Sequence, residues 1–198
     1  MTAIIDYGVG NLFSLSCSLE HLGLECVVTN NREVIENADK IILPGVGAFA
    51  DARELLRKDG LDSFIIGQAK SGKPFLGICL GMQLLFDKSF EYGEHEGLGL
   101  IKGEIRPIPT TLKIPHIGWN ALNFKKVDPL TKYIKDGDFV YYVHSYCAMD
   151  CDESLVATSD YGTEVAGIVR NGNICGTQFH PEKSGDVGLN ILKAFGEM

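Results

Sequence analysis

The hydrophobic pattern of the first half of the chain alternates between short apolar runs and longer segments of helical period. Leucines that recur every three or four residues predict a helix from Leu12 to Leu22, with Asn11 as its N-cap and Gly23 at its end. The remaining predicted elements are strands over 3–6, 25–28, 40–43 and 73–78 and helices over 51–58 and 61–69. Strands and helices that alternate at these intervals indicate a parallel sheet with right-handed crossovers.

The second half of the chain is richer in strand patterns and turn residues. Strands are predicted over 100–106, 117–124, 139–144, 154–158, 164–170 and 174–179. Asn-Gly-Asn at 171–173 predicts a hairpin between the last two, and a final helix has Val187, Ile191, Leu192 and Phe195 on one face. We therefore expect one α/β domain over 1–198, with a central, mostly parallel sheet, antiparallel extensions of that sheet and helices on both faces.

Composition narrows the classes of function. Of the 198 residues, 45% are hydrophobic and 22% are charged, which is ordinary for a globular protein. The formal net charge of -8 argues against general binding of nucleic acid, which needs clustered lysine and arginine. The N-terminal segment lacks the features of a secretory signal, and no apolar run has the length of a membrane span. We expect a cytoplasmic protein that binds neither nucleic acid nor membranes.

The cysteines are scattered and form no CxxC pair of the kind that holds zinc. A reduced, cytosolic set of thiols is the simplest account of this pattern. We expect no metal site and no cofactor. The six positions are Cys17, Cys26, Cys79, Cys147, Cys151 and Cys175.

Cys79 stands between two glycines in Gly-Ile-Cys-Leu-Gly, where a predicted strand ends and a helix begins. A sharp turn there lifts one side chain above the sheet edge, as in the nucleophile elbow G-x-S-x-G. The helix N-terminus favours a thiolate, and the N–H of Leu80 would point toward a developing oxyanion. From this motif alone, a cysteine that merely fills the core fits equally well.

His180 and Glu182, in the sequence Phe-His-Pro-Glu, supply the base that a cysteine nucleophile needs. Pro181 favours an extended backbone at His180, and extended residues two apart project to the same side. Glu182 can then hold one tautomer of His180 and stabilise the imidazolium. Together with Cys79, this pair favours catalysis over a structural interpretation.

Two other histidines compete for the role of the base. His144 lies inside a predicted strand, and His116 follows Pro115 in a predicted loop. Neither has an acidic residue two positions on. We expect both to be structural or to line the substrate site.

The elbow cysteine, the H-P-E dyad and the parallel sheet together resemble the class I, or triad, glutamine amidotransferases. The motifs occur in the family's order and cover nearly the whole chain. They are PGVGAF at 44–49, GICLGMQ at 77–83, PHIGWN at 115–120, VHSY at 143–146 and QFHPEKSG at 178–185. The resemblance implies that Cys79 attacks the side-chain amide of glutamine, that His180 protonates the departing ammonia and then activates water, and that Glu182 orients His180.

The resemblance also implies roles for residues around the nucleophile. Val46 and Gly47 would complete the oxyanion hole with Leu80, because a glycine-flanked peptide can rotate where other residues resist. The substrate glutamine would be held by the side chain of Gln83 and the backbone of Ser145 and Tyr146.

A partner protein is a further implication. PGVGAF and PHIGWN are similar to the family members that deliver ammonia to a cyclase subunit, a (βα)8 barrel, in a heterodimer of histidine biosynthesis. Asn11, Trp119 and Tyr141 match positions that face this partner. Two alternatives stay open from the sequence: a cyclase-like partner that modifies surface sugars, and a cysteine hydrolase that acts alone.

Overall fold

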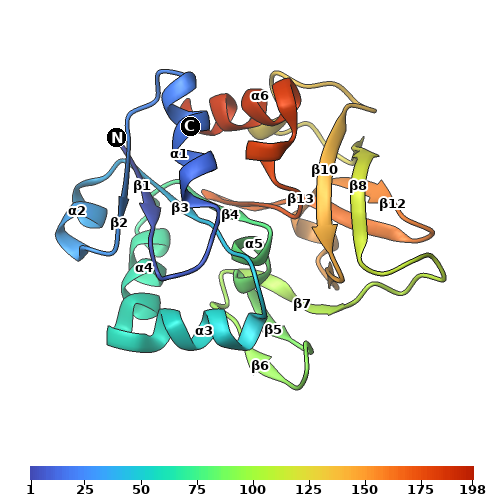
Figure 1. Cartoon of the computed structure of the whole chain (residues 1–198), viewed down its shortest axis with the longest axis horizontal. Coiled ribbons are helices and arrows are strands. Elements are labelled where there is room, and N and C mark those ends of the chain that lie inside the picture. The colour runs from blue at the N-terminus through green and yellow to red at the C-terminus, as the bar shows by residue number, and fades with distance from the viewer.

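The computed structural model describes residues 1–198 and is built around an eight-stranded sheet of order β2-β1-β3-β4-β14-β13-β12-β9 (Figure 1). The first five strands in this order run parallel to one another. They are β1 (Thr2–Ile5), β2 (Cys26–Thr29), β3 (Lys40–Leu43), β4 (Phe75–Ile78) and β14 (Ile174–Thr177). The predicted parallel core of the fold is confirmed.

Antiparallel strands extend this sheet on one side. They are β13 (Glu164–Asn171), β12 (Leu155–Asp160) and β9 (Asn123–Phe124). The predicted hairpin is present, because Asn171 pairs with Ile174 and Gly172 adopts a φ of 61° between them. A positive φ costs glycine little, so it suits this tight turn.

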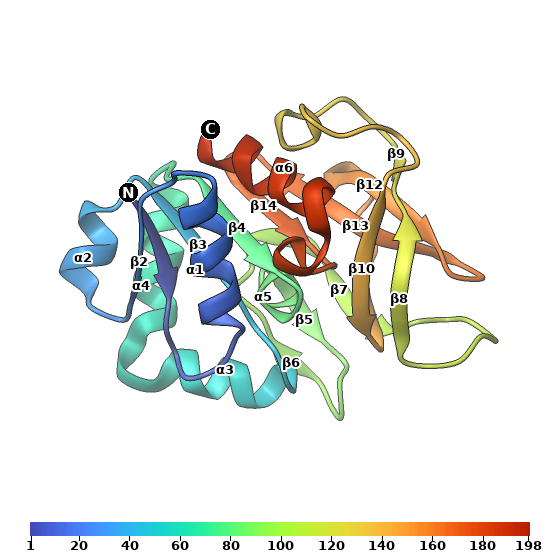
Figure 2. The same cartoon turned by 45° about the horizontal axis from the view of Figure 1, so that its top comes forward.

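Helices cover both faces of the sheet (Figure 2). On one face, α1 (Leu12–His21) and α6 (Gly185–Gly196) pack in a core cluster that includes Ile4. Ile5, the next residue of β1, belongs to the core on the opposite face, as the alternation of side chains along a strand requires. The helices of that face are α2 (Arg32–Asn37), α3 (Phe49–Arg57), α4 (Leu61–Lys70) and α5 (Leu80–Leu84). None of the helices combines the length and the hydropathy that a membrane span requires.

The predicted antiparallel extensions are confirmed, and two smaller sheets contain the remaining strands. β8 (His116–Ala121) pairs only with β10 (Phe139–His144), and these strands form a separate two-stranded ladder. The other is a four-stranded sheet of order β11-β7-β5-β6. Its strands are β5 (Phe86–Ser89), β6 (His95–Glu96), β7 (Ile101–Pro107) and β11 (Tyr146–Met149). Hydrophobic alternation shows that a segment is a strand, but it does not show which strand is its neighbour.

Several local expectations need correction. The predicted strand 117–124 is divided at Leu122, whose backbone bonds to Asp138 and Gly137 instead of continuing the ladder. Asn11 occupies the N-cap position of α1, but its side chain makes no capping hydrogen bond. Gly23 does end this helix, with a φ of 70°.

Candidate active site

Cys79 occupies a strained turn between β4 and α5. Its φ of 54° and ψ of -112° are unusual for a residue with a side chain, and such strain is typical of functional sites. Glycine is required at the two flanking positions because a side chain has no room there. A Cβ on Gly81 would overlap the carbonyl oxygen of Leu43, and one on Gly77 would lie 2.6 Å from the carbonyl oxygen of Gly81. The predicted nucleophile elbow is therefore present.

His180 reaches the same edge of the sheet because β14 and β4 are parallel neighbours. Thr177 pairs with Ile78, so the chain leaves both strands at the same edge. The sulfur of Cys79 is nearly covered, at 7% exposure for the residue, and His180 is 2% exposed. Cys79 and His180, which are far apart in the sequence, are therefore both buried at the same edge of the sheet.

Glu182 contacts His180 as predicted, but by a different backbone route. Its Oε1 lies 2.8 Å from His180 Nδ1. His180 is extended, whereas Glu182 lies in the 3₁₀ turn η4 (Pro181–Lys183), so the argument from two extended residues is wrong. The tight turn, which begins at Pro181, brings the carboxylate back to the ring.

The charges around His180 favour its imidazolium form. Burial lowers the pKa of His180, but hydrogen bonds to Cys79 and Glu182 outweigh burial and raise it to about 9. Because Nδ1 faces the carboxylate, Nε2 is the nitrogen left for the sulfur. The arrangement can hold a thiolate–imidazolium pair, which is the reactive form of a cysteine nucleophile.

A cavity of about 590 Å³ opens over this group. Cys79 and His180 line it together with the predicted residues Val46, Gly47, Leu80, Gln83, Ser145 and Tyr146. The structure therefore brings the predicted nucleophile, oxyanion and substrate residues to one cavity.

Comparison with known proteins agrees with this geometry. The family model described as class-I glutamine amidotransferase matches residues 3–196. The chain belongs to this family. The imidazole glycerol phosphate synthase subunit HisH of Oceanobacillus iheyensis is 50% identical over 199 residues, which cover 100% of this chain and 99% of that protein. The HisH subunit of Aquifex aeolicus is 52% identical over 98% of this chain and 95% of its own.

Two solved structures share the fold of this chain. A structure described as a glutamine amidotransferase superposes with a TM-score of 0.77 at 18% identity, covering 98% of each chain. The structure of PurLQS from Thermotoga maritima gives a TM-score of 0.74 at 22% identity, over 98% of this chain and 96% of that one. At these identities the likeness concerns the fold.

The loop that precedes α3 in this amidotransferase packs tightly against the elbow. A Cβ on Gly45 would lie 2.8 Å from the backbone nitrogen of Gly81, and the Tyr7 hydroxyl donates to the Pro44 carbonyl at 2.8 Å. Beyond this anchor, Val46 is 41% exposed and Gly47 has a φ of 96°. The loop is thus held at its start and has a conformationally free glycine next to the cavity.

Gln83 links two walls of the amidotransferase cavity. Its Nε2 donates to the Tyr146 carbonyl at 3.1 Å and to Gln178 Oε1 at 3.0 Å. The side chain is 5% exposed. Its place at the cavity agrees with the predicted role in substrate binding, which stays a prediction.

Glu91 is a residue of the cavity that the sequence did not indicate. It is the only aspartate or glutamate among the residues that line the cavity. Its Oε2 accepts a hydrogen bond from the backbone N–H of Phe49, the first residue of α3, at 2.7 Å. Glu91 follows β5, a strand that the sequence analysis missed, and no motif marks the position.

The three predicted partner-facing residues lie in two places. Trp119 and Tyr141 are directly opposite in the β8–β10 ladder, with ring centroids 6.0 Å apart, and Trp119 is 55% exposed. Asn11 is instead beside the dyad, where its Nδ2 donates to Glu182 Oε1 at 3.4 Å. The backbone of Tyr141 also bonds to His180 and Ser184, so the ladder and the dyad are in direct contact.

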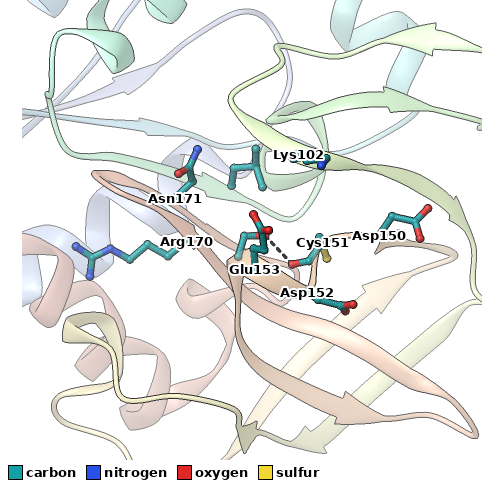
Figure 3. A pocket seen from close by; sticks show the side chains of 9 residues that line it. Lys102, Asp150, Cys151, Asp152, Glu153, Arg170 and Asn171 are labelled. Carbon is teal, nitrogen blue, oxygen red and sulfur yellow. Dashed lines mark hydrogen bonds between the residues drawn. The ribbon is translucent and has the colours of Figure 1, made fainter.

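A second cavity, of about 560 Å³, lies away from the elbow and contains no comparable chemistry (Figure 3). Its acidic side chains Asp150, Asp152 and Glu153 point in different directions. Burial raises the pKa of its one thiol, Cys151, to about 11, which keeps it protonated. No group of three or more histidine, cysteine, aspartate or glutamate side chains in the structure could hold a metal ion.

Proposed function

We propose that this chain is the glutaminase subunit of imidazole glycerol phosphate synthase. It hydrolyses L-glutamine to glutamate and ammonia, and the ammonia serves a cyclase subunit in the synthesis of imidazole glycerol phosphate and AICAR. The observation that carries the proposal is the Cys79–His180–Glu182 arrangement at a cavity, in a chain that matches HisH subunits over its whole length.

The chemistry follows from the positions of the three side chains. The Cys79 thiolate attacks the side-chain amide carbon, and His180 Nε2–H protonates the departing ammonia, which leaves a glutamyl thioester. His180 then accepts a proton from water, which attacks the thioester and releases glutamate. Glu182, buried at 2% exposure of its side chain, stabilises the imidazolium at each stage.

The oxyanion of each tetrahedral intermediate needs hydrogen-bond donors. The N–H of Leu80 lies in the first turn of α5 and has no partner inside the helix. We assign the second donor to the peptide between Val46 and Gly47, which borders the same cavity.

The other end of the substrate needs a partner of opposite charge. The α-ammonium of glutamine is a cation, and Glu91 supplies the carboxylate that the cavity offers it. Gln83 and the backbone of Ser145 and Tyr146 would position the rest of the substrate.

A cyclase partner fits the fate of the product. Ammonia released into water at neutral pH is mostly protonated and no longer nucleophilic, so a second subunit must receive it directly. We assign the partner-facing surface of the heterodimer to Trp119, Tyr141 and Asn11, and the exposed tryptophan suits an interface anchor. A cytoplasmic location agrees with six free cysteines.

The test is a reconstitution with the cyclase subunit and its ribonucleotide substrate. Wild-type protein should support glutamine-dependent synthesis of imidazole glycerol phosphate. Cys79→Ala should abolish it, while synthesis from added ammonium continues. Glutamine hydrolysis without imidazole glycerol phosphate would instead indicate another partner. Turnover of peptides or esters by the isolated chain would indicate a cysteine hydrolase that acts alone.

A further inference from the structure

A second pair of buried histidines lies outside the catalytic group. His116 on β8 and His144 on β10 face each other in the ladder, with Nδ1 of His116 3.0 Å from Nε2 of His144. They are 2% and 6% exposed. Only His144 lines the cavity, and neither residue has a part in the chemistry described above.

The partners of these rings determine their tautomers. His144 Nδ1 lies 2.8 Å from the carbonyl oxygen of Tyr146, which can only accept, so Nδ1 carries a proton. Neutral His144 then has a lone pair on Nε2, and His116 must donate its Nδ1–H to it. His116 is consequently also an Nδ1–H tautomer, with a lone pair on Nε2.

Asn120 agrees with this assignment from the other side. Its Nδ2 donates to the Asp160 carbonyl at 2.8 Å, and its Oδ1 accepts from the N–H of Ala121 at 2.8 Å. Both contacts give the amide the same orientation. The amide therefore presents an N–H, at 3.4 Å, to the lone pair of His116 Nε2.

The chain of hydrogen bonds continues to the nucleophile. The Tyr146 carbonyl that accepts from His144 also accepts from Gln83 Nε2 at 3.1 Å. Gln83 donates to Gln178 Oε1 at 3.0 Å, and Gln178 Nε2 lies 3.9 Å from the sulfur of Cys79. We call this series the histidine chain; its members are Asn120, His116, His144, the Tyr146 carbonyl, Gln83 and Gln178.

We infer that His116 and His144 are positioning residues of the glutaminase, which as neutral Nδ1–H tautomers hold the Tyr146 carbonyl and through it Gln83 against the substrate cavity. The inference rests on the proposed function and adds two residues to it. We therefore expect the pair to affect the binding of glutamine, measured as KM, rather than the rate at which the thioester forms and breaks, measured as kcat.

The surroundings keep the pair neutral. The ring of His116 stacks on those of Tyr142 and Tyr161, with centroids 4.7 and 3.9 Å away. No carboxylate contacts either ring. Burial lowers the pKa of each histidine to about 4. For His144 the hydrogen bond to the Tyr146 carbonyl raises the pKa, but burial outweighs it, and the nearby His116 and His180 also lower it. Both rings are buried, and each of their nitrogens has a hydrogen-bond partner, so the pair has one arrangement of protons.

The tautomers can be observed directly. Long-range proton–nitrogen correlation spectra of the histidine rings distinguish Nδ1–H, Nε2–H and imidazolium forms. In wild-type protein at pH 7 we expect His116 and His144 to show the Nδ1–H pattern. An Nε2–H or imidazolium pattern for either ring would overturn the inference. The spectra need no substrate, so they decide on the histidine chain even where a glutaminase assay contradicts the proposed function.

Two variants of His116 separate positioning from mere packing. His116→Leu removes the donor, whereas His116→Asn keeps an N–H near the position of Nδ1. In the complex with the cyclase subunit, His116→Leu should raise KM for glutamine about tenfold with kcat changed less than about twofold, since one buried hydrogen bond is lost. His116→Asn should restore most of the affinity. Synthesis from ammonium should be equal in both.

Two results would contradict the positioning role of His116. An unchanged KM in folded His116→Leu would overturn the positioning role. Equal losses in the two variants would indicate that only the volume of the ring matters, which also contradicts it. Folding of each variant is checked by its urea unfolding curve.

Discussion

The backbone N–H of Cys79 donates to the carbonyl of Thr177 at 2.7 Å. This bond joins the residue after β4, the proposed nucleophile, to the end of β14, from which the chain reaches His180 three residues later. The separation of Cys79 and His180 is therefore set by the spacing of two adjacent strands in a sheet. Cys79 and His180 thus lie just beyond two strands, on turns that a rigid sheet positions.

Gly81, two residues after Cys79, should be indispensable because a side chain has no room at this position, rather than because its backbone must be flexible. A Cβ on Gly81 would overlap the backbone of Leu43, which cannot move away easily. Gly81→Ala should lower the free energy of unfolding by about 3 kcal/mol or more and abolish glutaminase activity. Gly67→Ala on α4 is the matched control, because nothing lies within 4 Å of its Cβ position. It should raise stability by about 0.5–1 kcal/mol. Equal effects in urea unfolding would refute the steric argument.

Glu91 should matter for the affinity of glutamine. Glu91→Gln keeps an acceptor for the N–H of Phe49 but removes the negative charge that we assign to the substrate ammonium. A charge-assisted hydrogen bond is worth about 1.5–3 kcal/mol, so KM for glutamine should rise by about one to two powers of ten. Synthesis from ammonium in the complex should not change. A variant with the wild-type KM would show that the ammonium is held elsewhere.

Acid should destabilise the folded chain through the buried histidine pair. Burial lowers the pKa of His116 and of His144 from 6.5 to about 4, so between these values only the unfolded chain takes up their protons. The contribution of these pKa shifts to the free energy of unfolding is complete above pH 6.5. As the pH decreases below 6.5, this contribution decreases by about 1.4 kcal/mol per pH unit for each histidine. His180 has the opposite shift, so its contribution is complete below pH 6.5 and declines only as pH rises toward 9.

Urea unfolding at pH 7 and pH 5 measures this slope. We expect wild-type protein to lose about 2–4 kcal/mol between the two pH values. The double variant His116→Asn with His144→Asn should lose much less. If the two proteins show the same slope, the titrating groups lie elsewhere.

The loop 44–47 should act as a gate. Its start is held by Tyr7 and by the close contact of Gly45 with Gly81, while Gly47 leaves the following peptide free to rotate. Loss of one oxyanion donor costs about two to three powers of ten in rate. We expect the isolated chain to hydrolyse glutamine slower by this factor than the complex loaded with the synthase ligand, as a shift between two loop conformations. Equal turnover in the two states would show that no gate exists.

Local sequence determined the elements that depend on near neighbours. The strand-to-helix turn at Cys79 was predictable because two flanking glycines mark a crowded backbone, and the structure shows the overlap that any Cβ would cause. The contact of Glu182 with His180 was also predicted, although from an extended backbone that the structure does not show. Its route through a 3₁₀ turn was not, because the backbone after Pro181 is set by packing against β10 rather than by the proline alone.

Contacts between distant segments were decided only by the tertiary structure. The sequence showed no relation among Glu91, Gln178 and Cys79, and it placed His116 in a loop, whereas the fold buries that ring against His144 as the first residue of β8. A periodic pattern records which face of an element avoids water, and this information is local. Which strand lies alongside, and hence which polar groups must satisfy one another in the absence of water, depends on the free energy of the whole packed chain.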